Sequence, residues 1–219
     1  MPGKAFEVPA LTGPVVDQAQ FLKPRFSESL ALDLMNYKKQ TGVQIQVLII
    51  SSLNDEAIES VAIKVFDQWK LGEAKTDQGV LFLVAAKEKR MRIEVGQGLE
   101  GLVPDVVAKR IISDVVRPYF REKYYEEGVR YGVLALTEAI NKGKESGEVK
   151  TPQKKMKLEG GWVFLLLLGL WLLIFMISPA TALQILFAAL SGGRGGGSSN
   201  DRWSGGGGRS SGGGASGDW

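Results

Sequence analysis

The side chains able to do chemistry in this chain are carboxylates gathered around one glycine-rich stretch. Asp77 precedes an apolar run, and Glu94, Glu100 and Asp105 flank a series of glycines further along the chain. Carboxylate oxygens are the ligands that hard cations such as calcium take, about six to eight at a time. The same residues also suit plainer roles, because Asp beside Gly79 favours a turn and acidic groups stabilise a helix N-terminus. The residues alone leave both alternatives open: a shared cation site, or turn and capping residues.

The glycines between these carboxylates form a G-x-G-x-x-G pattern at Gly96, Gly98 and Gly101. In dinucleotide-binding loops this spacing follows the first strand of a βαβ unit. Here it follows what we predict to be the second strand of a hairpin, so the pattern does not indicate a nucleotide site. Exposed backbone amides before a helix could instead hold an anion such as phosphate. The alternative is a tight loop without a ligand.

The chain of 219 residues has no cysteine and no histidine. This excludes thiol nucleophiles, disulfides, zinc sites built on Cys or His, and catalytic triads that use a histidine base. Any catalysis must use carboxylates, hydroxyls, amines, backbone amides or a hard metal. The net charge of +3 has a local origin, because residues 1–149 hold 20 basic and 21 acidic side chains. The globular part is therefore not basic, and no nucleic-acid partner is predicted.

The elements that must position these groups follow from the apolar periodicity. Helical spacing of apolar residues predicts four helices, at 24–40, 58–69, 104–119 and 124–140. Runs rich in branched apolar residues predict three strands, at 43–51, 80–86 and 91–95. The short charged turn between the last two predicts an antiparallel hairpin. Together these elements predict an α/β fold, a three-layer α/β/α sandwich over a small mixed sheet.

Composition divides the chain into four parts. Residues 1–149 form the predicted globular domain, and residues 150–159 form a basic juxtamembrane linker. Residues 160–191 contain no charged side chain, which predicts one transmembrane helix, since about 20 apolar residues cross a bilayer. In residues 192–219, 13 of the 28 residues are glycine. Such a segment buries little apolar surface, so we expect a disordered tail.

Three motifs in the globular part carry a resemblance to a known family. They are T-D-Q-G-V-L at 76–81, R-I-E-V-G-Q-G-L-E-G at 92–101 and P-D at 104–105. A further match is T-G-V-Q-I at 41–45, before the first predicted strand. These motifs strongly resemble the TPM domain, and the resemblance covers about residues 14–141. The predicted membrane span and the glycine-rich tail are also similar to those of bacterial members.

The resemblance implies a Rossmann-like version of the three-layer fold. It also favours a divalent cation, calcium in particular, with Asp77, Glu94, Glu100 and Asp105 as ligands. Family members include thylakoid proteins linked to photosystem II repair and reported as acid phosphatases, and an animal auxiliary subunit of a receptor channel. We therefore predict a membrane-anchored module that binds a cation and maintains membrane proteins. The alternatives are a metal-dependent acid phosphatase and a structural, oligomeric membrane assembly protein.

The compartment and the partners follow less directly. The start, Met1-Pro2-Gly3-Lys4, is not followed by the apolar region of a signal peptide. The lysines before the predicted span favour a cytoplasmic domain. The resemblance favours an exported, periplasmic domain whose signal peptide is absent from this sequence, and that is the arrangement we expect unless Met1 is the native start. The expected partners are the lipid bilayer, a membrane protein and, as an alternative, further copies of the chain.

Overall fold

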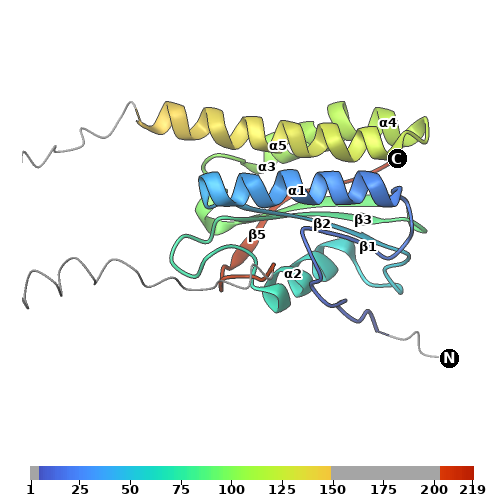
Figure 1. Ribbon diagram of the computed structural model, residues 1–219. Helices are drawn as coiled ribbons and strands as arrows, with labels where there is room; N and C mark the ends of the chain where they lie inside the picture. The colour runs from blue at the N-terminus through green and yellow to red at the C-terminus, as the bar shows by residue number, and fades with distance from the viewer. Residues whose placement is uncertain (1–4, 149–202) are drawn as a thin grey trace, which may run out of the picture. The chain divides into compact units, whose positions relative to one another are not determined.

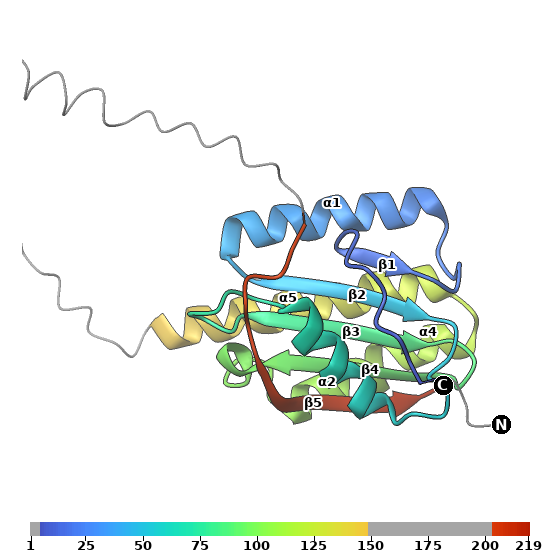
Figure 2. The same ribbon diagram turned by 90° about the horizontal axis from the view of Figure 1, so that it is seen from below.

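The computed structural model describes residues 5–148 and 203–219, which belong to one compact unit (Figure 1). Its centre is a five-stranded sheet with the strand order β1-β2-β3-β4-β5. The strands are β1 (Val15–Asp17), β2 (Gln44–Ile50), β3 (Gly79–Ala85), β4 (Arg90–Gly96) and β5 (Ser210–Asp218). The first three run parallel, and β4 is antiparallel to both β3 and β5, as Figure 2 shows. The sheet is therefore mixed, and the predicted hairpin is confirmed.

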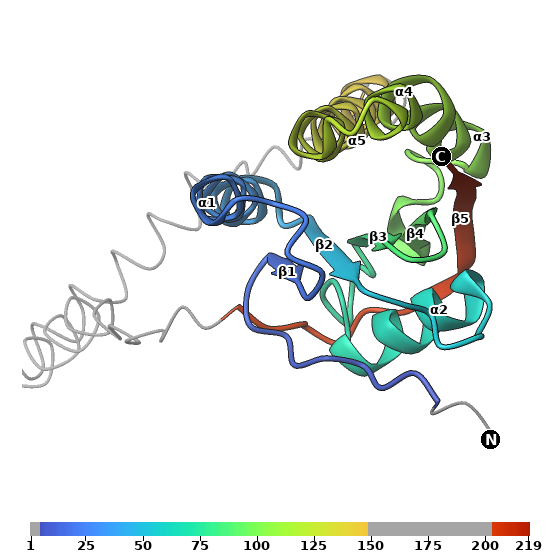
Figure 3. The same cartoon turned by 90° about the vertical axis from the view of Figure 1, so that its right-hand side faces the viewer.

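Helices cover both faces of this sheet, as the end-on view in Figure 3 shows. One face carries α1 (Pro24–Thr41), α3 (Asp105–Arg110), α4 (Arg117–Arg121) and α5 (Tyr125–Glu148). The opposite face carries α2 (Ile58–Trp69). Every residue of β2 and β3 is buried, because both faces of these strands are covered. The predicted α/β fold, with helices on both sides of a mixed sheet, is confirmed.

The predicted helix at 104–119 is continuous, but its middle is not α-helical. Residues Ile111–Val116 form a π-helical turn, η2, between α3 and α4. The Arg117 N–H donates to the carbonyl oxygen of Ile112, five residues back. Pro118 has no N–H and cannot complete an α-helical hydrogen bond to the preceding turn. A π-helical turn at this point therefore gives up fewer hydrogen bonds than it would in the interior of a regular α-helix.

Two of the five strands lie where the sequence predicted none. β1 has only three residues, too few for its alternation to be recognised. β5 lies in the glycine-rich segment at 192–219, for which we expected disorder. That expectation is wrong for residues 203–219, because Ser210–Asp218 pair along β4, with Arg90 opposite Asp218 and Gly96 opposite Ser210. The sheet therefore takes its last strand from the far end of the chain.

The end of β5 is fixed by the packing of Trp219 against the helical layer. Its ring meets Phe120 of α4 edge to face, with the ring centroids 4.9 Å apart. We expect Trp219→Ala to lower the free energy of unfolding by about 1–2 kcal/mol, because it removes a half-buried aromatic contact. Trp219→Phe keeps an aromatic ring and should recover most of that loss in urea unfolding curves. Equal losses in both variants would contradict this role for the ring.

The connections on either side of β2 run over opposite faces of the sheet. The chain moves in one direction across the sheet from β1 to β3, without the strand-order reversal of a doubly wound Rossmann fold. However, α1 follows β1 on one face and α2 follows β2 on the other. Where the helices that follow two neighbouring parallel strands cover opposite faces of the sheet, a crevice forms at the carboxyl ends of those strands, and such crevices commonly bind ligands. This arrangement marks the carboxyl ends of β1 and β2 as one place to look for a site.

The predicted membrane helix at 160–191 lies outside the described residues. Within residues 5–148 and 203–219, no helix is both long enough and apolar enough to cross a bilayer. The basic linker at 150–159 also lies outside the described residues.

Candidate functional site

Each of the four predicted cation ligands accepts a hydrogen bond from the C-terminal residues. Asp77 is the first of them and lies in the turn before β3, with a left-handed backbone at φ 49°. Asp is one of the few residues that tolerate this conformation. Its Oδ1 accepts the Arg209 N–H at 2.8 Å, and its own N–H donates to the Glu73 carbonyl oxygen at 2.8 Å. Asp77 therefore acts here as a turn residue that also binds the start of the last strand.

Glu94 is fully buried in β4 and forms an ion pair with Arg92, two residues earlier on the same face of the strand. Its Oε2 accepts from Arg92 Nε at 2.7 Å and lies 2.6 Å from Arg92 Nη2. Its Oε1 accepts the Ser210 hydroxyl at 2.5 Å. Burial raises the pKa of Glu94, and the Ser210 hydrogen bond and the Arg92 charge offset only part of that rise. Both oxygens of this carboxylate are thus used in contacts with Arg92 and Ser210.

Glu100 and Asp105 both line an open pocket beside β5. The Ser211 hydroxyl donates to Glu100 Oε1, and the Gly214 N–H donates to Asp105 Oδ1 at 2.8 Å. The register of β5 shifts between Val95 and Gly96, and such a shift redirects neighbouring side chains. The pocket is lined by Glu100, Pro104, Asp105, Val106, Ser211, Gly212 and Gly213. Two carboxylates and a hydroxyl thus face one solvent-open space.

The four carboxylates are spread along β5 and do not form one cluster. In the part of the chain that the structure describes, no three acidic side chains lie close enough together to hold a metal ion. Glu94 is buried against Arg92, and Asp77 contacts the residue just before β5. Glu100 and Asp105, in contrast, line the same pocket.

The predicted glycine loop packs closely against the turn that carries Asp77. A Cβ at Gly98 would overlap the Thr76 carbonyl oxygen, and one at Gly96 would overlap the Asp77 carbonyl oxygen. A Cβ at Gly101 would meet no atom within 4 Å. The loop itself is a short 3-10 helix, η1 (Gln97–Leu99). Two of its amides are used inside the protein, since Gln97 N–H donates to Arg209 and Gly98 N–H to Asp77.

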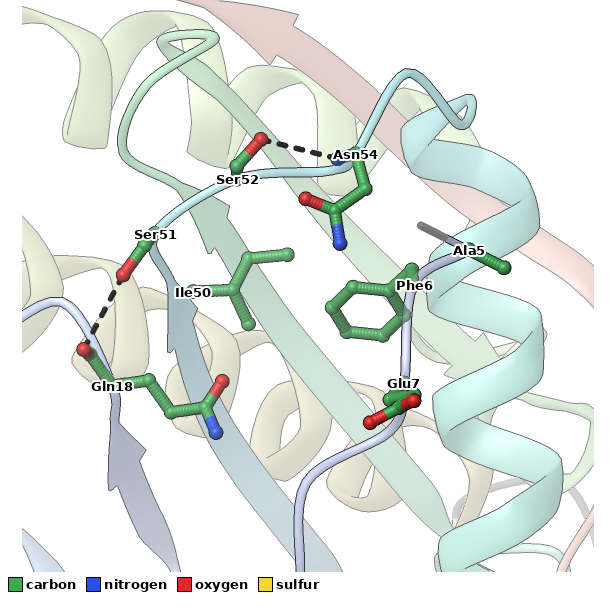
Figure 4. A pocket seen from close by; sticks show the side chains of 8 residues that line it. All are labelled: Ala5, Phe6, Glu7, Gln18, Ile50, Ser51, Ser52 and Asn54. Carbon is green, nitrogen blue, oxygen red and sulfur yellow. Dashed lines mark hydrogen bonds between the residues drawn. The ribbon is translucent and has the colours of Figure 1, made fainter. Parts of the chain in front are cut away.

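The crevice at the carboxyl ends of β1 and β2 holds a second, separate pocket (Figure 4). Its polar lining includes Gln18, Ser51, Ser52 and Asn54, and Phe6 closes one side. The Ser52 hydroxyl donates to Oε1 of Glu88 at 2.7 Å. The other oxygen of that carboxylate is buried and has no hydrogen-bond partner among the described residues. Sequence reasoning missed this pocket, because finding it requires knowing that α1 and α2 cover opposite faces.

Comparison with protein families bears directly on this fold. A family model described as the TPM domain matches residues 15–139, more than half of the chain. The chain belongs to the TPM domain family. The match runs from β1 into α5, so it includes all four predicted ligands and the loop glycines, whereas β5 lies beyond it. In this TPM-domain chain, the last strand of the sheet therefore comes from outside the family match.

Two solved structures that are similar to this TPM domain were determined by NMR. One is the solution NMR structure of the N-terminal domain of a protein from P. gingivalis, with 31% identity and a TM-score of 0.59. It covers 65% of this chain and 96% of that one. Another is the NMR structure of the BA42 protein from Bizionia argentinensis, with 20% identity, a TM-score of 0.51, and coverage of 58% and 86%. No curated protein matches the chain.

Proposed function

We propose that this TPM-domain chain is a membrane-associated binding module that takes up a divalent cation, calcium first, at Glu100 and Asp105. The observation that carries the proposal is the open pocket in which these two carboxylates and the Ser211 hydroxyl face one space. All three groups offer oxygen, the donor that hard cations prefer. Calcium tolerates irregular ligand sets completed by water and backbone carbonyls better than magnesium does.

The sparse ligand set defines the expected affinity. Two carboxylates supply few of the oxygens that calcium takes, so a dissociation constant of about 0.1–1 mM is expected, as in weak extracellular modules. Calcium is also a weak activator of water, which favours binding over hydrolysis. The charge-free stretch at 160–191 and the family resemblance support a role at a membrane, in the maintenance of membrane proteins. Acid phosphatase activity stays a prediction.

Calcium should therefore stabilise the full chain through this pocket. At about ten times the dissociation constant, a ligand that binds only the folded state adds about 1.4 kcal/mol to the free energy of unfolding. We expect calcium to raise the thermal midpoint of the wild-type chain by a few degrees. Glu100→Gln combined with Asp105→Asn should abolish the shift.

The matched control for this measurement is Asp33→Asn, which removes an exposed carboxylate from α1. It should leave the calcium shift unchanged. The proposed site is ruled out if calcium does not raise the thermal midpoint of the wild-type chain. It is also ruled out if calcium still raises the midpoint of the Glu100→Gln, Asp105→Asn variant.

A further inference from the structure

The outer edge of β4 forms, with its nearby carboxylates, a surface built to accept a strand. We call it the acceptor edge and define it as β4 together with the side chains of Asp77, Glu100 and Asp105. The residues that bind it, 203–219, are called the C-terminal segment. Each carboxylate of the acceptor edge receives a backbone or hydroxyl donor from that segment. Arg92 donates to the Gly212 carbonyl oxygen at 3.1 Å and to the Ser216 hydroxyl at 3.0 Å.

The acceptor edge selects for glycine. A Cβ at Gly214 would overlap the Ile93 carbonyl oxygen of β4, and, outside the acceptor edge, a Cβ at Gly205 would overlap the Trp69 carbonyl oxygen. Gly214 also has φ 129°, which side-chain-bearing residues rarely adopt. The glycine content that suggested disorder is therefore what lets this segment approach the strand so closely.

Both ends of the C-terminal segment have specific contacts. At one end, Trp203 Nε1 donates to Gln46 Oε1 at 2.7 Å, and Lys38 Nζ lies 4.7 Å from the Trp203 ring centroid. At the other end, Arg117 pairs with Asp218, and Trp219 packs on α4. The segment is thus recognised along its whole length by groups that are independent of how it is joined to the rest of the chain.

The connection between the segment and the domain is long. Residues 149–202 separate α5 from the C-terminal segment, and 54 residues can reach at most about 180 Å. The entropic cost of closing a loop grows only slowly with its length, and a long tether gives an effective concentration of about millimolar at most. At the densities that proteins reach in a membrane, the segment of a second copy has a local concentration similar to that of the chain's own segment, so the two compete for β4.

We propose that the acceptor edge is an interface between copies of this chain, at which residues 203–219 of a second copy take the place of the chain's own. The incoming segment makes the same contacts, so the exchange costs no interaction. Reciprocal exchange closes a symmetric dimer, whereas one-way exchange links copies in a row. Without β5, β4 would also have unpaired backbone donors and acceptors along one side, and such an edge favours pairing with another strand. This interface needs no cation and goes beyond the proposed binding function.

The absence of native cysteine allows a direct test in the full chain. Arg90 and Asp218 lie opposite each other in the β4–β5 register. Directly opposed residues of antiparallel strands are close enough for a disulfide. Chains with Arg90→Cys and chains with Asp218→Cys are unfolded together, refolded together in detergent and oxidised. We expect a covalent dimer of one chain of each kind.

The matched control is Asp218→Cys combined with Gly214→Val, a chain whose segment cannot dock. It should give less heterodimer by about tenfold or more, the factor that corresponds to a docking loss of about 1.4 kcal/mol. A chain carrying both Arg90→Cys and Asp218→Cys shows that the pair can form a bridge at all. The proposal is overturned by a mixture that stays monomeric. It is equally overturned by heterodimer that forms to the same extent with the Gly214→Val chain, since that would reflect random collision.

Discussion

Gly214→Val should release β5 from the sheet and lower the free energy of unfolding by about 3 kcal/mol or more. The residue has φ 129°, and its Cβ would overlap the Ile93 carbonyl oxygen. β4 cannot move away from the added side chain, because its other side is paired with β3. The strand must therefore leave, and its pairing along β4 is lost with it.

Amide hydrogen exchange gives the most direct measurement of that loss. The amides of β4 that bond to β5 should exchange much faster in Gly214→Val, whereas those of β2 and β3 keep their protection relative to global unfolding. Gly101→Val is the control, since a Cβ there meets no atom within 4 Å and the residue lies in the same region. If Gly214→Val leaves β4 exchange at wild-type rates, β5 does not hold this edge.

Arg92→Leu should destabilise the chain by about 3–5 kcal/mol near pH 7, because it leaves the Glu94 carboxylate buried without its partner charge. Arg92 has 7% of its side chain exposed and Glu94 none, so water does not replace the lost contact. The change also removes two hydrogen bonds to β5, at Gly212 and Ser216. The buried pair thus links the core of the sheet to its last strand.

The loss should depend on pH in a defined direction. The pKa of Glu94 is raised in the folded chain, so the folded state holds this proton more tightly than the unfolded state does. The stabilising contribution of that proton is fully present below the unfolded pKa of about 4.3 and is lost as the pH rises through the folded pKa. Without Arg92 the folded pKa rises further. The gap between wild type and variant should therefore widen as the pH rises from about 4 to 7.

Urea unfolding at several pH values measures this gap, and a second change controls for its cause. Adding Glu94→Gln to Arg92→Leu removes the unpaired carboxylate while keeping a side chain of similar size. The double variant should recover much of the stability at pH 7 and show a flatter pH dependence than Arg92→Leu. A gap that is the same at all pH values would show that the lost hydrogen bonds, and not the buried charge, cause the destabilisation.

The sequence predicted those elements whose apolar pattern is long and regular. Six of the seven apolar residues of α2 are buried. β2 and β3 are buried throughout because helices cover both of their faces, and Gln44 and Gln46 are the polar residues of β2. β5 could not be found in this way. Its stability comes from backbone pairing, from carboxylates on other elements and from close approach at glycine, none of which composition records. The expectation of disorder rested only on the small apolar surface that this segment could bury by itself.

The cation site stays a prediction, and what the structure adds is the partner that its residues contact. Asp77, Glu100 and Asp105 do lie along one edge, but what they contact in the described structure is the C-terminal segment. Glu94 and Arg92 share one face of β4 by the two-residue period of a strand. That period could have predicted their pairing, whereas their hydrogen bonds to Ser210, Gly212 and Ser216 of β5 could not be predicted.

The pairing of β5 with β4 limits which side of a membrane each end of the described unit can occupy. Residues 148 and 203 border the stretch that contains the charge-free segment, and both belong to the same compact unit. A single passage through a bilayer between them would leave Ser210–Asp218 on the far side from the strand that it completes. In a chain that folds with its own β5, residues 148 and 203 therefore lie on the same side of any bilayer. A copy that gives its segment to a neighbour in the same membrane must likewise present residues 203–219 on the side where the neighbour's β4 lies.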